Sequence, residues 1–392
     1  MSFAPAKGPG GGKALAGFML TGFLMALLGA ILPAWGYHRD PPDFAAVGNY
    51  FLAFAAGIVL AAVLARRILA REGLRFLLVS SCTLSCLALG YLALVSPPAS
   101  EWWRVGGILA LGTGAGLLNM ALFQAISRTY QADAAGTINK GGIWYGLGCL
   151  AATALVAGTF YAYTVHTILF LMAVVPAVFG AIYIRSAYAT PAPGLHPTLR
   201  EALQDFRSPG AVMFALLLFF QFGNEWSLAG WLPLFLIRRV GMSPISALMI
   251  LMLYWTFLMG GRLAAVAILP RIRHGRLLLV SGALALFGCL ILFYTNNRFG
   301  AATAAIFIGA GYASIYPLVA EAIGRRFPYY HPGFFNGIFS LALLGGLLAP
   351  ATLGYAAASQ GVGVVIGLPL IGTFLVMILL LLIWLESKVT GR

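Results

Sequence analysis

The sequence predicts an all-α membrane protein whose twelve transmembrane helices form two pseudo-symmetric halves of six. Three observations predict this fold. Of the 392 residues, 61% are hydrophobic and only 9% are charged, whereas a soluble domain has about 25% charged residues. Twelve apolar runs are long enough, at about 20 residues each, to cross the hydrocarbon core of a bilayer. Segments of the first half also recur in the second half, which indicates an internal duplication.

The twelve apolar runs are separated by short polar connections that carry turn residues and charges. Such connections are HRDPPD at 38–43, SPPASE at 96–101, RTYQADAAGT at 128–137 and TNNR at 295–298. The predicted spans begin near Ala14, Phe44, Leu74, Arg104, Lys140, Val165, Gly210, Pro244, Gly275, Gly300, Gly333 and Gly361.

The basic residues predict the orientation of the spans. All but five of the 24 lysines and arginines fall on one side of them, and the five are Arg39, Arg104, Arg238, Arg239 and Arg298. Because cytoplasmic loops carry the excess of positive charge, we expect both termini in the cytoplasm. Topology therefore explains the formal charge of +14, and a nucleic acid partner is not expected because the cations are not gathered on one face. The few charges and the preference for Arg over Lys favour a bacterial inner membrane.

Three pairs of segments support the duplication, each separated by about 200 residues and found in the same order. AAVLARRILAREGLRFLLVSS at 61–81 recurs as AAVAILPRIRHGRLLLVSG at 264–282, and GTGAGLLNMALFQAI at 112–126 recurs as GAGYASIYPLVAEAI at 309–323. LLGAILP at 27–33 recurs as SLAGWLP at 227–233. A shared offset is not expected from chance similarity between apolar helices.

Five regions follow from these patterns. We expect a cytoplasmic tail at 1–13, a six-helix bundle at 14–187, a cytoplasmic linker at 188–208, a second six-helix bundle at 209–385 and a tail at 386–392. The N-terminal segment lacks a small-residue cleavage site, so it is read as a tail before a retained helix. Within the linker, TLREALQDF at 198–206 has the pattern of a short amphipathic surface helix.

The chain shows no constellation typical of an enzyme or a metal protein. The four cysteines lie inside apolar runs, which favours packing thiols over disulfides or metal ligands. No G-x-x-x-x-G-K-[ST] loop is present, so neither ATP as an energy source nor any cofactor is expected.

This organisation resembles that of the major facilitator superfamily over essentially the whole chain. The resemblance rests on six plus six helices, a long middle loop and a basic connection after the second helix of each half. The first connection, LARRILAREGLR at 64–75, keeps the basic residues but lacks the usual acid of the family's signature, and the second keeps Gly261 and Arg262. The resemblance implies a secondary transporter that works by alternating access, and not an enzyme.

Within the superfamily, the sequence resembles the fucose/glucose/galactose permease group. FGNEWSLAGWLP at 222–233 is similar to that group's seventh-helix pattern of Gly-x-Glu, a small residue and Trp-Leu, and further similar segments are GTGAGLLNMALFQ at 112–124, NKGGIWYGLG at 139–148 and GIFSLALLGGLLAPATLG at 337–354. One departure concerns proton coupling. The fucose permease branch is expected to use acids on helices one and four, but here helix one has none and helix four carries Asn119 and Gln124.

Glu225 is the acid that lies well inside an apolar run, with no Lys or Arg within ten residues on either side. An acid in the hydrocarbon costs about 3 kcal/mol on insertion scales, so by default it marks a functional site. It could accept hydrogen bonds from solute hydroxyls, or carry the coupled proton. The alternative is a structural acid, protonated or paired with an amide such as Asn119 or Gln124.

Sugar recognition requires amides and acids beside flat apolar faces. The predicted substrate-binding residues are Asn119, Gln124, Trp144, Tyr145, Gln221, Asn224, Glu225, Trp226, Tyr254, Trp255, Tyr312 and Tyr316. Gln221, Asn224 and Glu225 are three or four residues apart, so they share one helix face. Each aromatic residue could instead be a packing residue or an interface anchor.

A cytoplasmic gate is implied by the resemblance, since related folds close that side with ion pairs between the basic loops and an acid on helix ten. The candidates are Arg66, Arg67, Arg262, Glu321 and Arg325. Ordinary snorkelling of arginines to the interface is the alternative.

The sequence therefore predicts a monomeric, multi-pass transporter in the lipid bilayer that moves a small polar solute, with a monosaccharide as the expected class and protons as the expected coupling ion. An exporter or flippase for an amphipathic, lipid-like or drug substrate is the alternative, since Phe, Leu and Tyr outnumber polar groups in the expected cavity. A membrane receptor or scaffold without transport is a second alternative.

Overall fold

The structure is a computed structural model that describes residues 11–188, 205–268, 271–327 and 337–390. These residues form helices joined by short connections, and no strand occurs among them. The helices are α1 (Gly11–Met25), α2 (Leu27–Ile31), α3 (Phe44–Leu94), α4 (Glu101–Ala125), α5 (Ser127–Ala132), α6 (Ala134–Thr159), α7 (Val165–Ile184), the 3-10 turn η1 (Asp205–Arg207), α9 (Pro209–Val240), α10 (Pro244–Ile268), α11 (His274–Tyr294), α12 (Arg298–Tyr312), α13 (Ile315–Arg326), α14 (Gly337–Gln360) and α15 (Val364–Thr390).

The helices supply the twelve spans that the sequence predicts. Ten helical segments in the described residues are long and apolar enough to cross a membrane. One of them, α3, has 51 residues and folds back on itself, so it makes the second and third spans. The short helices α1 and α2 follow each other and make the first span, and α12 continues into α13 as the tenth. The predicted fold class is thereby confirmed.

Several helices begin where a side chain caps the first turn. Asp43 accepts a hydrogen bond from the backbone N–H of Ala46, at 3.0 Å, and Asn297 accepts one from Gly300, at 2.8 Å. Such caps satisfy N–H groups that have no partner inside the helix. The expected connection at 128–137 differs from the prediction, because α5 and the first turn of α6 occupy it.

Gly73 produces the reversal inside α3. Its φ of 82° lies in the left-handed region, and the residues on both sides are helical. Only glycine adopts this conformation without a steric cost. The basic connection that was expected between the second and third spans is therefore a single sharp turn.

The duplication is visible in the packing of helices. A Cβ atom on Gly112 of α4 would collide with the carbonyl oxygen of Phe54 in α3, and a Cβ on Gly309 of α12 would collide with that of Tyr254 in α10. The members of the two pairs are separated by about 200 residues in the chain, which is the offset of the sequence repeats. Small residues at these crossings let the backbones approach closely, and the two halves use the same device.

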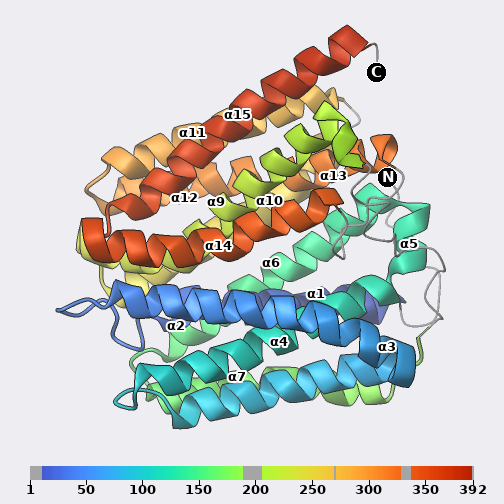
Figure 1. Ribbon diagram of the computed structural model, residues 1–392. Coiled ribbons are helices and arrows are strands. Elements are labelled where there is room, and N and C mark those ends of the chain that lie inside the picture. The colour runs from blue at the N-terminus through green and yellow to red at the C-terminus, as the bar shows by residue number, and fades with distance from the viewer. Residues whose placement is uncertain (1–10, 189–204, 269–270, 328–336, 391–392) are drawn as a thin grey trace.

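The helices form two bundles that lie side by side (Figure 1). The first contains α1 to α7, and the second contains α9 to α15. They meet where α3 packs on α14 and α6 packs on α10. The start of α1 and the end of α15 lie at the same end of the molecule (Figure 1), which we name the terminus face. The opposite end, which carries the connection between α2 and α3 at 32–43, is the loop face.

Contacts between the halves close the loop face. Arg238 of α9 forms an ion pair with Asp40, at 2.7 Å, and the hydroxyl of Tyr355 in α14 donates to Asn49 of α3, also at 2.7 Å. Burial and the neighbouring cation of Arg39 lower the pKa of His38, so this histidine is neutral beside the ion pair at pH 7.

The ends of the bundles differ in detail from the expected regions. The helix α1 begins at Gly11, inside the segment expected as a tail, and α15 continues through Thr390, beyond the expected boundary at 385. An ion pair between Glu386 of α15 and Arg326 of α13 supports this extension. Most of the predicted linker at 188–208, including most of TLREALQDF, lies outside the described residues; α9 begins directly after η1.

Candidate functional site

A cavity of about 170 Å³ lies between the two halves. An enclosed water molecule needs about 10–15 Å³ of such space, so the cavity has room for a small organic solute. Polar groups in its wall belong to Thr21, Asn119, Thr137, Glu225 and Arg262, and aromatic groups belong to Phe18, Phe123, Tyr145, Phe222, Trp226, Tyr316 and Phe339.

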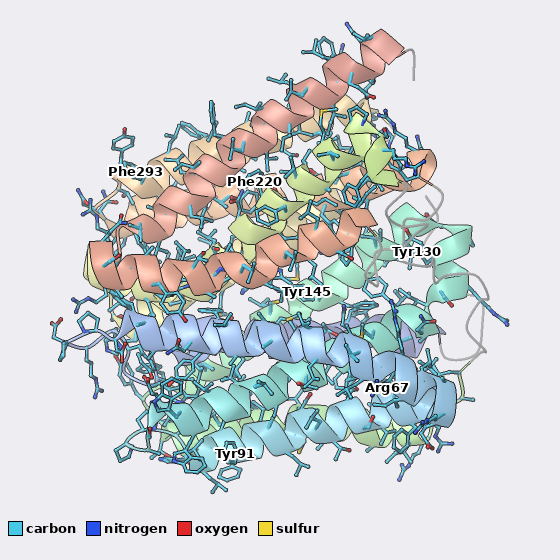
Figure 2. The ribbon with its side chains drawn as sticks, viewed as in Figure 1. Arg67, Tyr91, Tyr130, Tyr145, Phe220 and Phe293 are labelled. Carbon is cyan, nitrogen blue, oxygen red and sulfur yellow. The ribbon has the colours of Figure 1, made fainter. Side chains whose placement is uncertain are left out.

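The cavity extends toward the terminus face, since Ile126 and Thr137, at the ends of α4 and α6 on that side, contribute to its wall. On the other side it adjoins a smaller cavity of about 40 Å³, which shares Tyr145 and Trp226 with it and adds Trp255. Tyr145 lies near the centre of the molecule, between the two bundles (Figure 2). The site therefore lies between the halves, with the closed loop face beyond it.

Glu225 faces this cavity from α9, and its side chain is partly accessible. The side chain of Gln221, one turn earlier, donates a hydrogen bond of 2.7 Å to Oε1 of the carboxylate. This pairing follows from the spacing of four residues on a helix. The amide partner is thus Gln221, and not Asn119 or Gln124, which the structural alternative named. No cation lies within 4.0 Å of this carboxylate among the described residues.

Arg262 of α10 lines the same cavity, and its residue is only 6% exposed. No hydrogen bond or ion pair joins its guanidinium to another residue in the described part of the chain, and Nε is fully buried. The guanidinium packs closely on Gly142 of α6, where a Cβ atom would collide with it. The site therefore contains two opposite charges that do not form an ion pair with each other.

This position of Arg262 differs from its expected place in a cytoplasmic gate. The reason is the length of α10, which continues through Ile268 and carries Arg262 inside the helix instead of in the connection. The signal that could have revealed it is the apolar run itself, because Arg262 is the charged residue within the span that starts at Pro244.

The other predicted site residues that line the cavities come from both halves. Asn119, Tyr145, Trp226 and Tyr316 line the larger cavity, and Trp255 lines the smaller one. Their helices are α4, α6, α9, α10 and α13. The structure thus brings together an amide, an acid, a guanidinium and four aromatic rings.

The remaining predicted residues lie behind the cavity wall or outside it. Asn224 donates to Thr373 of α15, at 3.3 Å, and the hydroxyl of Tyr312 lies 2.7 Å from the same threonine. Both are buried in a polar cluster of the second half. Tyr254 is fully buried against Trp255. Two further residues differ in exposure: Gln124 is buried, and Trp144 is 38% exposed on the outer surface.

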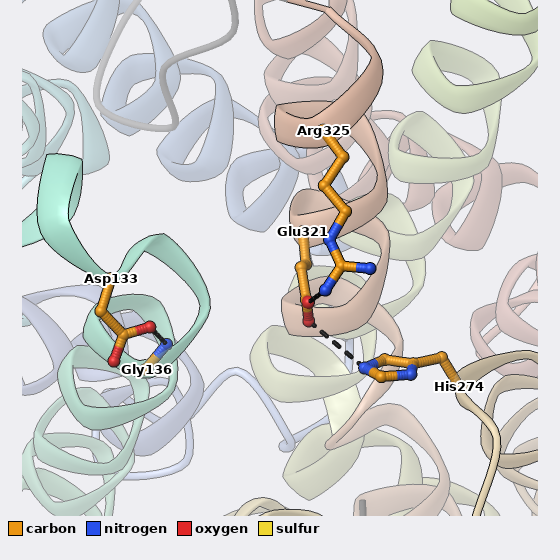
Figure 3. A network of polar contacts seen from close by, with 5 residues as sticks. All are labelled: Asp133, Gly136, His274, Glu321 and Arg325. Atoms are coloured by element: carbon orange, nitrogen blue, oxygen red, sulfur yellow. Dashed lines mark hydrogen bonds and ion pairs between the residues drawn. The ribbon is translucent and has the colours of Figure 1, made fainter. Parts of the chain in front are cut away.

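The other four candidate gate residues lie at the terminus face, and no ion pair between described residues links them across the two halves. Glu321 forms an ion pair with Arg325 of the same helix and lies 3.6 Å from Nε2 of His274 in α11 (Figure 3). These three residues all belong to the second half. Arg66 and Arg67 are exposed at the end of the second span, and the figures show Arg67 toward the terminus face (Figure 2).

Sequence reasoning missed several residues of the cavity wall, namely Phe18, Thr21, Met25, Phe123, Phe222, Phe339 and Leu343. Most of them are apolar residues in apolar helices, so no local pattern distinguishes them from lipid-facing residues.

Comparisons with known proteins support the fold. No curated protein matches the chain. A variant of the fucose:proton symporter of E. coli has a crystal structure with a TM-score of 0.64 and 13% identity, and the match covers 95% of this chain and 98% of that one. The nucleoside transporter NupG gives 0.66 at 13% identity over 96% and 99%, and the D-xylose-proton symporter gives 0.73 at 14% over 95% of both chains.

The sequence profile described as "Major Facilitator Superfamily" matches residues 141–350. This match spans more than half of the 392 residues, and it reaches from α6 to α14, across both halves. The chain is therefore a multi-pass membrane transporter, not an enzyme, and it belongs to the Major Facilitator Superfamily.

Proposed function

We propose that this transporter moves a small polar solute of the monosaccharide class across the membrane by alternating access, and that Glu225 couples the movement to protons. The observation that carries the proposal is a partly accessible acid, held by Gln221, in a central cavity with aromatic walls between two pseudo-symmetric halves.

The chemistry of the wall suits a solute with several hydroxyl groups. The carboxylate of Glu225 can accept hydrogen bonds, and the amide of Asn119 can accept and donate them. Trp226, Tyr145 and Tyr316 offer flat faces for the C–H surface of a ring. Two of the similar solved structures are named as symporters of fucose and of D-xylose with protons, which supports the solute class and the coupling ion.

Proton coupling would use the cost of the charge on Glu225. An ionised acid at this depth is unfavourable, so uptake of a proton removes the charge before the halves close around it. Gln221 holds the carboxylate in place and still leaves its second oxygen for the solute or the proton. The loop-face contacts between the halves would have to open in the opposite state of the cycle.

The distribution of basic residues indicates which face of the protein lies on which side of the membrane. The positive-inside rule assigns the terminus face, and thus both termini, to the cytoplasm. The cavity described here would then extend toward the cytoplasm. A bacterial inner membrane and a monomeric state complete the proposal, since each chain of this fold contains a complete central site.

The experiment is uptake of a panel of labelled monosaccharides into proteoliposomes, with and without an inward proton gradient. Wild type is compared with Glu225→Gln and with Glu72→Gln, a control acid that is exposed at the terminus face. We expect uptake stimulated by the gradient in wild type and in the control, and uptake blind to the gradient in Glu225→Gln. Uptake that ignores the gradient in all three would make the protein a facilitator and remove the coupling role.

A second candidate function is export or flipping of an amphipathic, lipid-like or drug substrate. The aromatic and aliphatic share of the cavity wall favours it, with Phe18, Phe123, Phe222 and Phe339 around the polar groups. Its test is the same preparation with a fluorescent lipid. Flux of the lipid without any monosaccharide flux would establish this function instead.

A further inference from the structure

We propose that the solute is an anion: the cavity binds a sugar acid, a polyhydroxylated monocarboxylate, whose carboxylate lies against Arg262 while its hydroxyls meet Glu225 and Asn119. This inference rests on the proposed monosaccharide class and specifies its charge. It is carried by the burial of Arg262 without a partner and by unpaired hydrogen-bond donors in the walls of the two cavities.

The first observation is a buried cation without a partner. Arg262 is 94% buried, counted from its exposure of 6%, and its guanidinium has no hydrogen bond or ion pair to any described residue. A buried charge is strongly unfavourable unless it is paired. Because Arg262 lies in the wall of a cavity, the missing partner can be supplied by a ligand, and a carboxylate matches the fork of a guanidinium.

The second observation is a pair of buried hydrogen-bond donors without partners in the walls of the two adjoining cavities. Nε1 of Trp255 and Oγ1 of Thr21 are also buried without a partner in the described residues, and their residues line the two adjoining cavities. The indole N–H of Trp255 can only donate, and the hydroxyl of Thr21 can donate. An oxygen-rich, anionic group satisfies such donors, whereas a hydrocarbon ligand would leave them unpaired.

Glu225 does not serve as the counter-ion of Arg262. The two groups are not within 4.0 Å, and one carboxylate oxygen already accepts the bond from Gln221. They are the charged groups among the residues that line the larger cavity, and the other titratable groups that face it are the phenols of Tyr145 and Tyr316. With Glu225 protonated, the wall carries one net positive charge, which attracts an anion.

The charge balance has a measurable consequence. One proton and one monocarboxylate moving together carry no net charge, so their transport responds to a pH gradient and not to membrane potential. A neutral sugar moving with a proton carries one positive charge and is accelerated by an inside-negative potential. The two solutes therefore differ in their electrical behaviour as well as in their rates.

The experiment compares matched probes in proteoliposomes. D-galacturonate and D-galactose differ by a carboxylate in place of a CH₂OH group, as do D-glucuronate and D-glucose. Uptake is measured with a pH gradient alone and with an inside-negative potential set by potassium and valinomycin. We expect wild type to take up the acids about 10- to 100-fold faster than the parent hexoses, which is the effect of hydrogen bonds to a charged group, without stimulation by the potential.

Three variants locate the effect. In Arg262→Gln the ratio of acid to hexose uptake should collapse toward one, and in Arg262→Lys, which keeps the charge but loses the fork, it should fall part of the way. The control is Arg239→Gln, an exposed arginine at the loop face, which should keep the wild-type ratio. Thermal melting of each purified variant shows whether it is folded.

The outcomes separate the inference from the proposed function. Hexose uptake that exceeds uptake of the acids in wild type overturns the inference and leaves the monosaccharide class intact. An unchanged ratio in folded Arg262→Gln also overturns it. If neither acids nor hexoses are transported, both the proposed function and the inference fail.

Discussion

Two arginines in this protein are equally buried and yet have opposite surroundings. Arg104 and Arg262 are each 6% exposed. Arg104, at the loop face, donates to the hydroxyls of Tyr50 and Tyr37, at 2.8 and 3.1 Å, and to the carbonyl oxygens of Ala99 and Val95, at 2.7 and 3.5 Å. Arg262, in the central cavity, has no hydrogen bond to any described residue.

The difference shows that a buried charge can either stabilise the fold or mark a binding site, depending on whether the protein supplies its partners. Arg104 also lies over the rings of Trp35 and Tyr50, at 5.8 and 5.9 Å from their centroids, so the protein itself supplies acceptors and aromatic faces for its guanidinium. Such a residue stabilises the fold. A buried cation that the protein leaves uncompensated, as with Arg262, costs stability, and it is better explained by a ligand.

The largest effect that would test this comparison is the loss of Arg104. In Arg104→Met the carbonyl groups of Ala99 and Val95 lose their donors, and we expect destabilisation of about 3 kcal/mol or more. The measurement is the melting temperature of the purified protein in detergent, followed by tryptophan fluorescence. Arg239→Met, at an exposed position of the same face, should melt like wild type. An unchanged melting temperature for Arg104→Met would show that Arg104 does not stabilise the fold.

The second test is the same substitution in the cavity. Arg262→Met removes an uncompensated charge, so we expect stability that is equal to wild type or higher by up to about 2 kcal/mol. Uptake of the sugar acids should fall at the same time to that of the parent hexoses, because their carboxylate loses its partner. A fall in melting temperature as large as that of Arg104→Met would show that Arg262 is structural.

The smallest expected effect concerns two amides of a single helix, α9, one in the cavity and one behind it. Gln221 donates to Glu225 in the cavity, whereas Asn224 donates to Thr373 behind it. Gln221→Leu should lower proton-driven uptake by about tenfold, since the lost bond involves a charged group. Asn224→Leu should lower the melting temperature and keep uptake per folded molecule. Equal loss of uptake in both variants would contradict the assignment of Gln221 to the cavity and of Asn224 to the packing behind it.

The fold was predictable because its main signals are local. Span length is set by the thickness of the bilayer, and polar connections must lie outside the hydrocarbon, so apolar runs locate the helices. The positions of Phe44, Val165 and Pro244 as first residues agree with the structure. The repeat offset pairs the segment that begins at Gly112 with the one that begins at Gly309, and in the structure both glycines lie at close helix crossings.

The candidate site was predictable only in part. The spacing of Gln221 and Glu225 on one helix face is enough to place them in contact. The same rule grouped Asn224 with them, but α9 packs on both α14 and α15, so its polar face is divided between the cavity and Thr373. Trp144 and Tyr145 are adjacent in sequence, and one reaches the outer surface while the other lines the cavity.

Composition and periodicity alone determine that this chain spans a membrane with two related halves, because the bilayer acts on each helix separately. The partners of each polar group depend on helices far apart in the chain. Arg104 donates hydrogen bonds to Tyr50 and to the connection just before its own helix. Arg262 packs on Gly142 of α6 and has no acceptor among the described residues. The sequence assigns Arg104 and Arg262 to opposite sides of the membrane, but it does not show which of them the protein pairs. Only the packing of helices separates them, since the free energy of a buried charge depends on the groups that surround it.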